Sequence, residues 1–196
     1  MLVTYTGKVF DYNNITKDSI DIKDIAHSLS HLNRFVGHSS RPYSVAEHSL
    51  WCAYMAEKLG YSKRLRLLTL IHDFEEAYTG DCPTPLKQLL PEFSVIAKKV
   101  ENAIYEHIGI EPPTPEEKHL IKRIDLTMLA IEMRDLTLHA YHEFVDDNTY
   151  MDFFNSPTFD LNDPSITRDT KRLSDGINLA YSELMLLLTL EEKGNK

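Results

Sequence analysis

Apolar residues recur at three- and four-residue intervals along most of this chain, from about residue 22 onward. This spacing places apolar side chains on one face of an α-helix. The first dozen residues, in contrast, have the pattern of short strands. We therefore predict an all-α bundle with a short N-terminal β-hairpin. The predicted helices cover residues 21–35, 43–60, 62–78, 92–108, 115–138 and 165–190, with a short Pro-interrupted helix within 81–93 and an irregular segment over 143–165.

Helix-terminating residues support these boundaries. Ser44 is a candidate N-cap, and Glu47 three residues later completes the pattern of a capping box. Gly37, Gly60 and Gly80 follow the ends of the first three predicted helices. No linker, repeat or low-complexity tract divides the sequence, so we predict one domain over residues 1–196.

Charge and composition exclude several classes of protein. The formal net charge of −9 argues against a nucleic-acid partner, because binding to a phosphate backbone depends on clustered Lys and Arg. The most apolar run, LMLLLTL at 184–190, is too short to span a bilayer, and the N-terminus has no signal-peptide pattern. Cys52 and Cys82 are too few for a disulfide framework and are interpreted as small apolar side chains. These features predict a soluble cytoplasmic protein without a membrane partner.

The segment LIHDFEEAYTGDCPTP at 70–85 concentrates polar residues in an apolar helical setting. Adjacent side chains such as His72 and Asp73 diverge by about 100° on a helix, so they share a metal ion only at a helix end or in a crevice. His48 and Asp125 are candidate partners from other helices, since each is a polar residue among apolar neighbours. The alternative is that the histidines are satisfied core residues and Asp125 pairs locally.

These residues, in this order, resemble the HD-domain phosphohydrolases. The resemblance rests on His48 in YSVAEHS, on His72 and Asp73 in HDFEEAYTGDCPTP, and on Asp125 in IKRIDL, and it covers roughly residues 7 to 130. The extended motif, with the residues that surround these four, is similar to the branch of the family that acts on deoxynucleotides. That branch includes bacterial 5'-deoxynucleotidases and phage dATP triphosphohydrolases. The N-terminal block is similar to the phage-type members in particular.

The resemblance implies a site and roles for its residues. His48, His72, Asp73 and Asp125 would hold one divalent ion, whose identity (Zn, Co, Mn, Fe or Mg) this ligand set leaves open. Glu76, four residues after His72, would orient or deprotonate the attacking water, and Asp81 would protonate the leaving oxygen. The substrate-binding candidates are Arg34 for phosphate, Lys87 as a second cation, and Phe35 against sugar or base or simply in the core.

The remaining acidic residue and several histidines lie outside the matched motif. Glu75, about 100° from Glu76 on a helical wheel, is expected to be a solvated surface acid. His27 and His38 lie in the similar N-terminal block, and their roles stay open. The remaining candidates, His107, His119, His139 and His142, match nothing in the pattern and are expected on the surface or in packing contacts.

The leading hypothesis is a metal-dependent deoxynucleotide phosphohydrolase that cleaves dATP to deoxyadenosine and tripolyphosphate, in a bacterium or a phage-infected cell. A 5'-deoxynucleotidase acting on deoxynucleoside monophosphates is the alternative, because both reactions release the 5'-oxygen. A nucleotide-binding protein without catalysis, or a helical scaffold, is a further alternative. The apolar run at 184–190 favours either a homo-oligomer interface or a central core helix.

Overall fold

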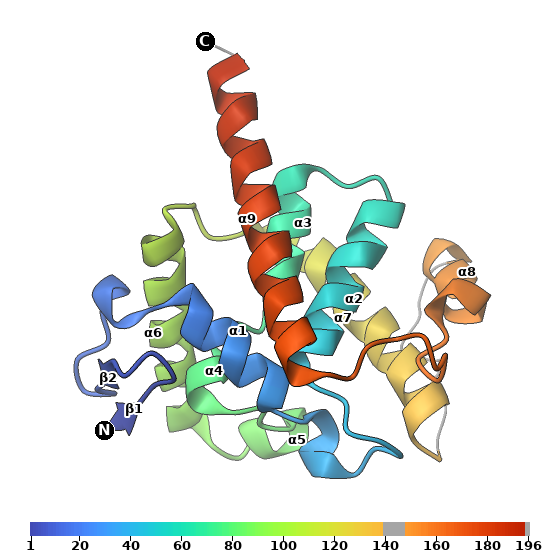
Figure 1. Cartoon of the computed structure of the whole chain (residues 1–196), viewed down its shortest axis with the longest axis horizontal. Helices are drawn as coiled ribbons and strands as arrows, with labels where there is room; N and C mark the ends of the chain where they lie inside the picture. The colour runs from blue at the N-terminus through green and yellow to red at the C-terminus, as the bar shows by residue number, and fades with distance from the viewer. Residues whose placement is uncertain (139–147, 195–196) are drawn as a thin grey trace.

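The helix α2 (Val45–Lys58) runs through the middle of a helical bundle in the computed structural model, which describes residues 1–138 and 148–194. Four helices pack against it: α1 (Ile22–His31), α3 (Lys63–Leu70), α7 (Pro115–Leu136) and α9 (Thr170–Gly194) (Figure 1). The predicted all-α class is confirmed.

Shorter elements complete the described part of the chain. The strands β1 (Leu2–Val3) and β2 (Val9–Phe10) pair antiparallel, which confirms the N-terminal hairpin. The remaining elements are α4 (Glu76–Thr79), α5 (Thr84–Lys87), α6 (Pro91–Ile108) and α8 (Asn148–Asn155), with 3-10 turns η1 (Lys17–Ser19), η2 (Arg34–Gly37) and η4 (Pro157–Phe159). A single domain over residues 1–196 stays a prediction.

Buried apolar side chains along α2 belong to two different cores, one near its start and one farther along the helix. Val45 and Ala46 belong to a core shared with α1, α3, α4, α6 and α9, whereas Cys52, Met55 and Ala56 pack with residues of α7, α8 and η4. A polar residue on α2 between these two cores is removed from water. His48 occupies that place and is fully buried.

Four parts of the predicted arrangement of helices were wrong. The helix predicted over 165–190 begins only at Thr170. The predicted helix over 62–78 stops at Leu70, and consecutive turns follow over residues 71–75 before α4 begins. The predicted helix over 21–35 stops at His31, since Leu32 is extended and the next residues pair with the start of α2. The segment predicted to be irregular contains α8, while its residues 143–147 lie outside the described ranges, as do His139 and His142.

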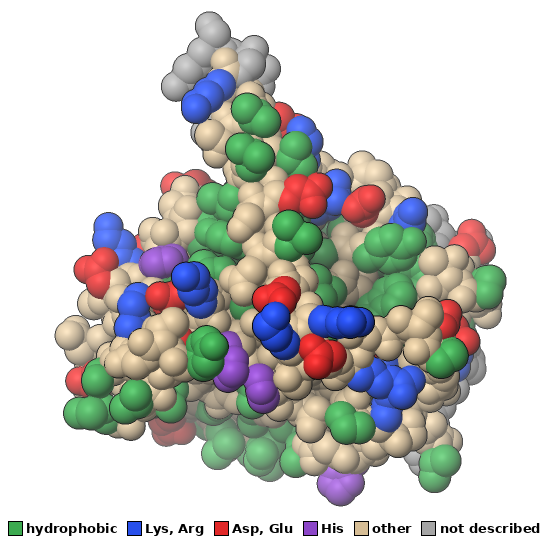
Figure 2. Space-filling view, viewed as in Figure 1, with side chains coloured by type: hydrophobic (Ala, Val, Ile, Leu, Met, Phe, Trp, Pro, Cys, Tyr) green, Lys and Arg blue, Asp and Glu red, His purple; other side chains and the backbone are tan. Residues whose placement is uncertain are grey.

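The final helix extends beyond the body of the molecule. Figure 1 shows its C-terminal end projecting from the bundle, and Figure 2 shows hydrophobic side chains along that projection. In the apolar run at 184–190, Leu184 is buried, whereas Leu186 and Leu190 are 59% and 55% exposed. The run therefore serves the core only in part, and homo-oligomerisation stays a prediction. None of the described helices is long and apolar enough to cross a membrane.

The start of α2 has the predicted cap. The Oγ of Ser44 accepts a hydrogen bond of 3.1 Å from the backbone N–H of Glu47. In a complete capping box, the side chain of Glu47 would also accept a hydrogen bond from the backbone N–H of Ser44. Here the carboxylate of Glu47 contacts Arg41 instead, at 2.6 Å. The cap thus satisfies a backbone donor one residue before His48.

Substitution of Ser44 by alanine tests this cap. We expect Ser44→Ala to lower the free energy of unfolding by about 1 kcal/mol, since a helix donor loses its partner. For a chain of this size that corresponds to a fall of about 2–4 °C in melting temperature. Ser182→Ala, an exposed position within α9, is the matched control and should change little. Equal melting temperatures for both variants would contradict the proposed contribution.

Candidate metal centre and active site

The turns after α3 bring two adjacent side chains into one space. Because the helix ends at Leu70, His72 and Asp73 are free of the helical angle that would separate them. The Nε2 of His72 lies 3.3 Å from Oδ2 of Asp73. The helix end at Leu70, which the sequence placed eight residues too late, is therefore the feature that allows these two neighbours to face one point.

His48 from α2 and Asp125 from α7 complete a group that we call the His–Asp cluster: His48, His72, Asp73 and Asp125. The Nε2 of His48 lies 3.3 Å from Nε2 of His72. It is also 3.6 Å from Oδ2 of Asp73 and 3.4 Å from Oδ1 of Asp125. The Nε2 of His72 lies 4.0 Å from the same Asp125 oxygen. Donors about 2 Å from one divalent ion are separated by about 3–4 Å, so the spacing fits such an ion.

Hydrogen bonds on the far side of each imidazole fix which nitrogen faces the cluster. The Nδ1 of His72 lies 2.7 Å from the carbonyl of Thr69, which can only accept, so Nδ1–H is the donor. The Nδ1 of His48 lies 2.5 Å from Oε1 of Glu132. If both rings are neutral, two bare Nε2 lone pairs point at each other across 3.3 Å. Such an arrangement requires a proton or a metal cation between them.

Glu132 on α7 links the cluster to Arg34. Its Oε2 accepts from Nε of Arg34 at 3.1 Å, and its side chain is completely buried. The Nη1 of Arg34 lies 3.6 Å from Asp73. Sequence reasoning missed Glu132. A usable signal existed, because Glu132 follows Asp125 by seven residues, which places both on the same face of a helix.

The backbone that carries Arg34 is tied to the start of α2. The N–H of Arg34 donates to the carbonyl of Tyr43 at 2.8 Å. Phe35 and Val36, which follow, have positive φ angles of 58° and 53°, unusual for residues other than glycine. This sharp turn holds Arg34 against Glu132, while the partly buried Phe35 packs against the core shared by α2 and α7.

Opposite charges set the protonation of the His–Asp cluster. Burial disfavours the charged form of His72, but the carboxylate of Asp73 outweighs it and raises the pKa of His72 to about 9. Burial also opposes ionisation of Asp73, yet His72 holds the pKa of that carboxyl far below its usual range. Similarly, His48 overcomes the effect of burial on Asp125 and lowers its pKa. Without a metal, the cluster therefore retains protons near neutral pH.

A second acidic group lies beside the cluster. Burial, followed by the charges of Asp73 and Asp81, raises the pKa of Glu76 to about 10. Burial also raises the pKa of Asp81, although Arg34 opposes this effect. The Nζ of Lys87 lies 3.5 Å from Oε1 of Glu76. The structure thus places Glu76, Asp81, Arg34 and Lys87 near Asp73, and their catalytic and substrate-binding roles stay predictions.

The interpretation of Glu75 as a solvated surface acid was wrong. Its Oε2 is buried and accepts no hydrogen bond from any described residue. Burial and the nearby charge of Asp73 raise the pKa of Glu75 to about 8. The helical-wheel angle failed because Glu75 lies in the turns that precede α4. The site therefore contains one more protonated carboxyl group than expected.

The N-terminal histidines lie apart from this group. The ring of His27 stacks on Tyr5 with centroids 3.7 Å apart and also contacts His31. His38 is exposed. The Nδ1 of His107 lies 2.9 Å from the carbonyl of Lys17, and His119 is exposed, as predicted.

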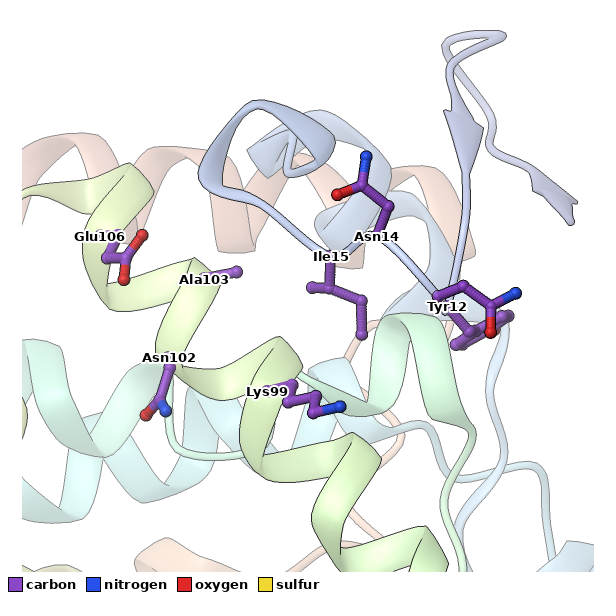
Figure 3. A pocket seen from close by; sticks show the side chains of 8 residues that line it. Tyr12, Asn14, Ile15, Lys99, Asn102, Ala103 and Glu106 are labelled. Atoms are coloured by element: carbon purple, nitrogen blue, oxygen red, sulfur yellow. The ribbon is translucent and has the colours of Figure 1, made fainter.

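Two cavities differ in their relation to the cluster. One of about 330 Å³ is lined by His72 and Asp125 and by the lysines Lys98, Lys118 and Lys122, but by none of the predicted substrate-binding residues. Another, of about 350 Å³, lies between the loop after β2 and α6. Figure 3 shows its side chains, including Asn14, Asn102 and Glu106. Only the first cavity opens beside possible metal ligands.

Comparison with known proteins gives the family. A family model described as "5'-deoxynucleotidase YfbR-like" matches residues 24–126. The chain belongs to this family. The match spans more than half of the chain and contains every residue of the predicted site, from Arg34 to Asp125. Family membership confirms the predicted phosphohydrolase of the deoxynucleotidase type.

Three individual proteins are also similar to this chain. The chain is 43% identical over 137 residues to the uncharacterized protein YfdR of Escherichia coli, which covers 69% of this chain and 71% of YfdR. It is 30% identical over 128 residues to 5'-deoxynucleotidase PM0747 of Pasteurella multocida, covering 52% of this chain and 66% of that protein. The cyanophage S-2L HD phosphohydrolase DatZ, solved with dA and one catalytic Zn²⁺, matches with a TM-score of 0.46 and 20% identity over 82% of this chain and 94% of DatZ.

The raised pKa values predict how pH affects the metal-free protein. The pKa of His72 is about 9 in the folded protein and about 6.5 in the unfolded chain. Its contribution to stability is therefore complete below pH 6.5 and is lost as the pH rises through 9. Glu75 and Glu76 act in the same direction, because the folded protein retains protons that the unfolded chain releases. We therefore expect the melting temperature of chelator-treated protein to fall between pH 6.5 and 9.

The matched variants are His72→Gln, which should reduce this fall, and His119→Gln at an exposed position, which should leave it unchanged. A melting temperature that stays level or rises across the same window would contradict the proposed protonation.

Glu132→Gln tests the contact behind His48. A carboxylate on the far nitrogen of a metal-binding imidazole increases its basicity, and its loss typically weakens metal affinity by about 10–100-fold. We expect a reduction of that size in zinc affinity, measured by competition with a chromophoric chelator. Glu116→Gln, at an exposed position on the same helix, is the control. Unchanged zinc affinity in Glu132→Gln would remove Glu132 from the metal centre.

Proposed function

We propose that this protein is a 5'-deoxynucleotidase that removes the phosphate from deoxynucleoside 5'-monophosphates. The observation that carries the proposal is the family match over residues 24–126, since this range contains the whole His–Asp cluster together with Glu76 and Asp81. Relatives such as PM0747 are named 5'-deoxynucleotidases. The cluster then holds the divalent ion, and the cavity beside His72 and Asp125 gives access to it.

The chain's own residues have distinct tasks in this reaction. A bound divalent ion supplies Lewis-acid activation of the phosphoryl group and of water. Glu76 ionises more readily once a cation offsets the charge of Asp73, and it then orients the water and accepts its proton. Asp81, whose pKa is raised by burial, protonates the departing 5'-oxygen. Arg34 and Lys87 orient the phosphate by charge-assisted hydrogen bonds.

Charge balance favours a monophosphate over a triphosphate. A phosphate monoester carries about 1.5–2 negative charges at pH 7, and each further phosphate adds more. The basic side chains that approach the cluster already have acidic partners: Arg34 contacts Glu132 at 3.1 Å, Lys87 contacts Glu76 at 3.5 Å, and Lys122 contacts Asp125 at 2.7 Å. Around the His–Asp cluster, these contacts leave little positive charge to bind the further phosphates of a triphosphate.

Hydrolysis of dATP to deoxyadenosine and tripolyphosphate, the function predicted first from the sequence, is the second candidate. Its support is the cavity beside the cluster, which Lys98, Lys118 and Lys122 line. Lys98 and Lys122 would have to exchange their acidic partners Glu101 and Asp125 for the additional phosphates. The two candidate functions therefore differ in the role of these lysines. They bind phosphates if the substrate is dATP and have no role if it is a monophosphate.

Parallel incubations with dAMP and dATP, followed by chromatography of the products, test the proposal. We expect phosphate and deoxyadenosine from dAMP and little turnover of dATP. The Glu76→Gln variant should retain metal but lose about two to four orders of magnitude in kcat. Glu106→Gln, exposed on α6, is the control.

Tripolyphosphate from dATP, with a KM that rises in Lys118→Ala for dATP alone, would replace the first candidate by the second. Loss of metal in Glu76→Gln would make Glu76 a ligand, and full activity would exclude its proposed role.

A further inference from the structure

The helix α4 is a single turn that carries Glu76 at its first position. One isolated turn of helix is unstable in water, because its formation fixes several backbone dihedral angles for one hydrogen bond. The place of α4 in the molecule is therefore set by its contacts with other elements. It lies against α1 (Figure 1).

Two hydroxyl groups from distant parts of the chain hold the backbone of α4. The last carbonyls of a helix have no partner within the helix and need one from elsewhere. The Oγ of Ser28, on α1, donates to the carbonyl of Ala77 at 2.9 Å. The hydroxyl of Tyr12, in the loop after β2, donates to the carbonyl of Tyr78. Two successive carbonyls of α4 are thus satisfied by side chains that lie 49 and 66 residues away in the sequence.

The side chain of Tyr78 attaches the same turn to the N-terminal segment. Its ring stacks on Phe10 of β2, with centroids 4.4 Å apart and planes at 21°. Its hydroxyl accepts a hydrogen bond of 3.2 Å from the backbone N–H of Asp21. Residues two apart on a helix point about 200° away from each other. Tyr78 therefore holds one side of α4, while Glu76 extends from nearly the opposite side to Lys87, at 3.5 Å.

We propose that Tyr12 and Ser28 are positioning residues for the hydrolysis, whose hydroxyl groups hold α4 so that the carboxylate of Glu76 stays directed at the attacking water. Both act through the backbone of α4 rather than by contact with the substrate or the ion. This inference rests on the proposed function, which gives Glu76 that task.

The kinetic consequence follows from the geometry of proton transfer. A general base must lie within hydrogen-bond reach of the proton that it accepts. A displacement of about 1 Å can cost about a hundredfold in rate. In the proposed function the phosphate is bound by Arg34, Lys87 and the ion, none of which is part of α4. Loss of either hydroxyl should therefore lower kcat while KM and metal content stay near their wild-type values.

Steady-state kinetics of the metal-loaded protein, with dAMP and with dATP, test this inference. We expect Tyr12→Phe and Ser28→Ala each to lose about tenfold in kcat, with KM within about twofold of the wild-type value. Ser28→Thr, which keeps a hydroxyl group, should restore most of the rate lost in Ser28→Ala. The controls are Tyr5→Phe and Ser182→Ala, two exposed positions, and both should retain the wild-type kcat.

Two further measurements separate positioning from general destabilisation. If the hydroxyl of Tyr12 acts through Glu76, then Tyr12→Phe should lower kcat no further in the Glu76→Gln protein. Backbone hydrogen exchange reports on α4 without catalysis. The N–H of Gly80, which donates to the carbonyl of Glu76 at 2.8 Å, should exchange faster in Tyr12→Phe than in the wild type or Tyr5→Phe.

The outcomes separate this inference from the proposed function. A wild-type kcat in Tyr12→Phe or in Ser28→Ala would overturn the role of that residue. An equal fractional loss in the Glu76→Gln protein, or unchanged exchange at Gly80, would overturn action through α4. Metal-loaded wild type that releases no deoxyadenosine from either nucleotide would overturn the proposed function, and with it the task of Glu76. Thermal unfolding identifies any variant that does not fold, and the other substitution then decides the question.

Discussion

The buried contact between Glu132 and His48 is the interaction on which the rest of the site depends. It joins α7 to α2 at 2.5 Å, and the second carboxylate oxygen binds Arg34. A buried carboxylate is tolerated only when such partners compensate its lost hydration. Burial opposes the ionisation of Glu132, but Arg34 and His48 lower its pKa, so it remains charged. The same contact directs the other nitrogen of His48 toward the cluster.

Around this contact, carboxyl groups lie so close together and so far from water that not all of them are ionised. Asp73 and Asp125 are stabilised as anions by the imidazoles, whereas Glu75 and Glu76 are kept protonated by burial and by Asp73. A divalent cation would relieve this repulsion and replace the protons between the imidazoles. Metal binding, proton release and stability are consequently linked in this protein.

The sequence predicted much of the fold because local signals and tertiary packing agree over most helices. Pro115 and the Thr114 cap begin α7 where the pattern indicated, and Gly109 ends α6. Prediction failed where tertiary contacts override periodicity. The helical pattern continues past Leu70 and past His31, but the chain turns there because His72 and Arg34 meet partners on α2 and α7.

The amino-acid sequence was enough to predict the helical class, the order of the helices and the polar residues that stand out among apolar neighbours. These follow from spacing along the chain, to which the family resemblance added candidate roles. Packing between elements was needed to show that Glu132 contacts His48, that Oε2 of Glu75 is buried, and that His48 and His72 face each other across 3.3 Å. The reason is physical: distances and dielectric surroundings between residues far apart in sequence arise only when α2, α7 and the turns after α3 pack together.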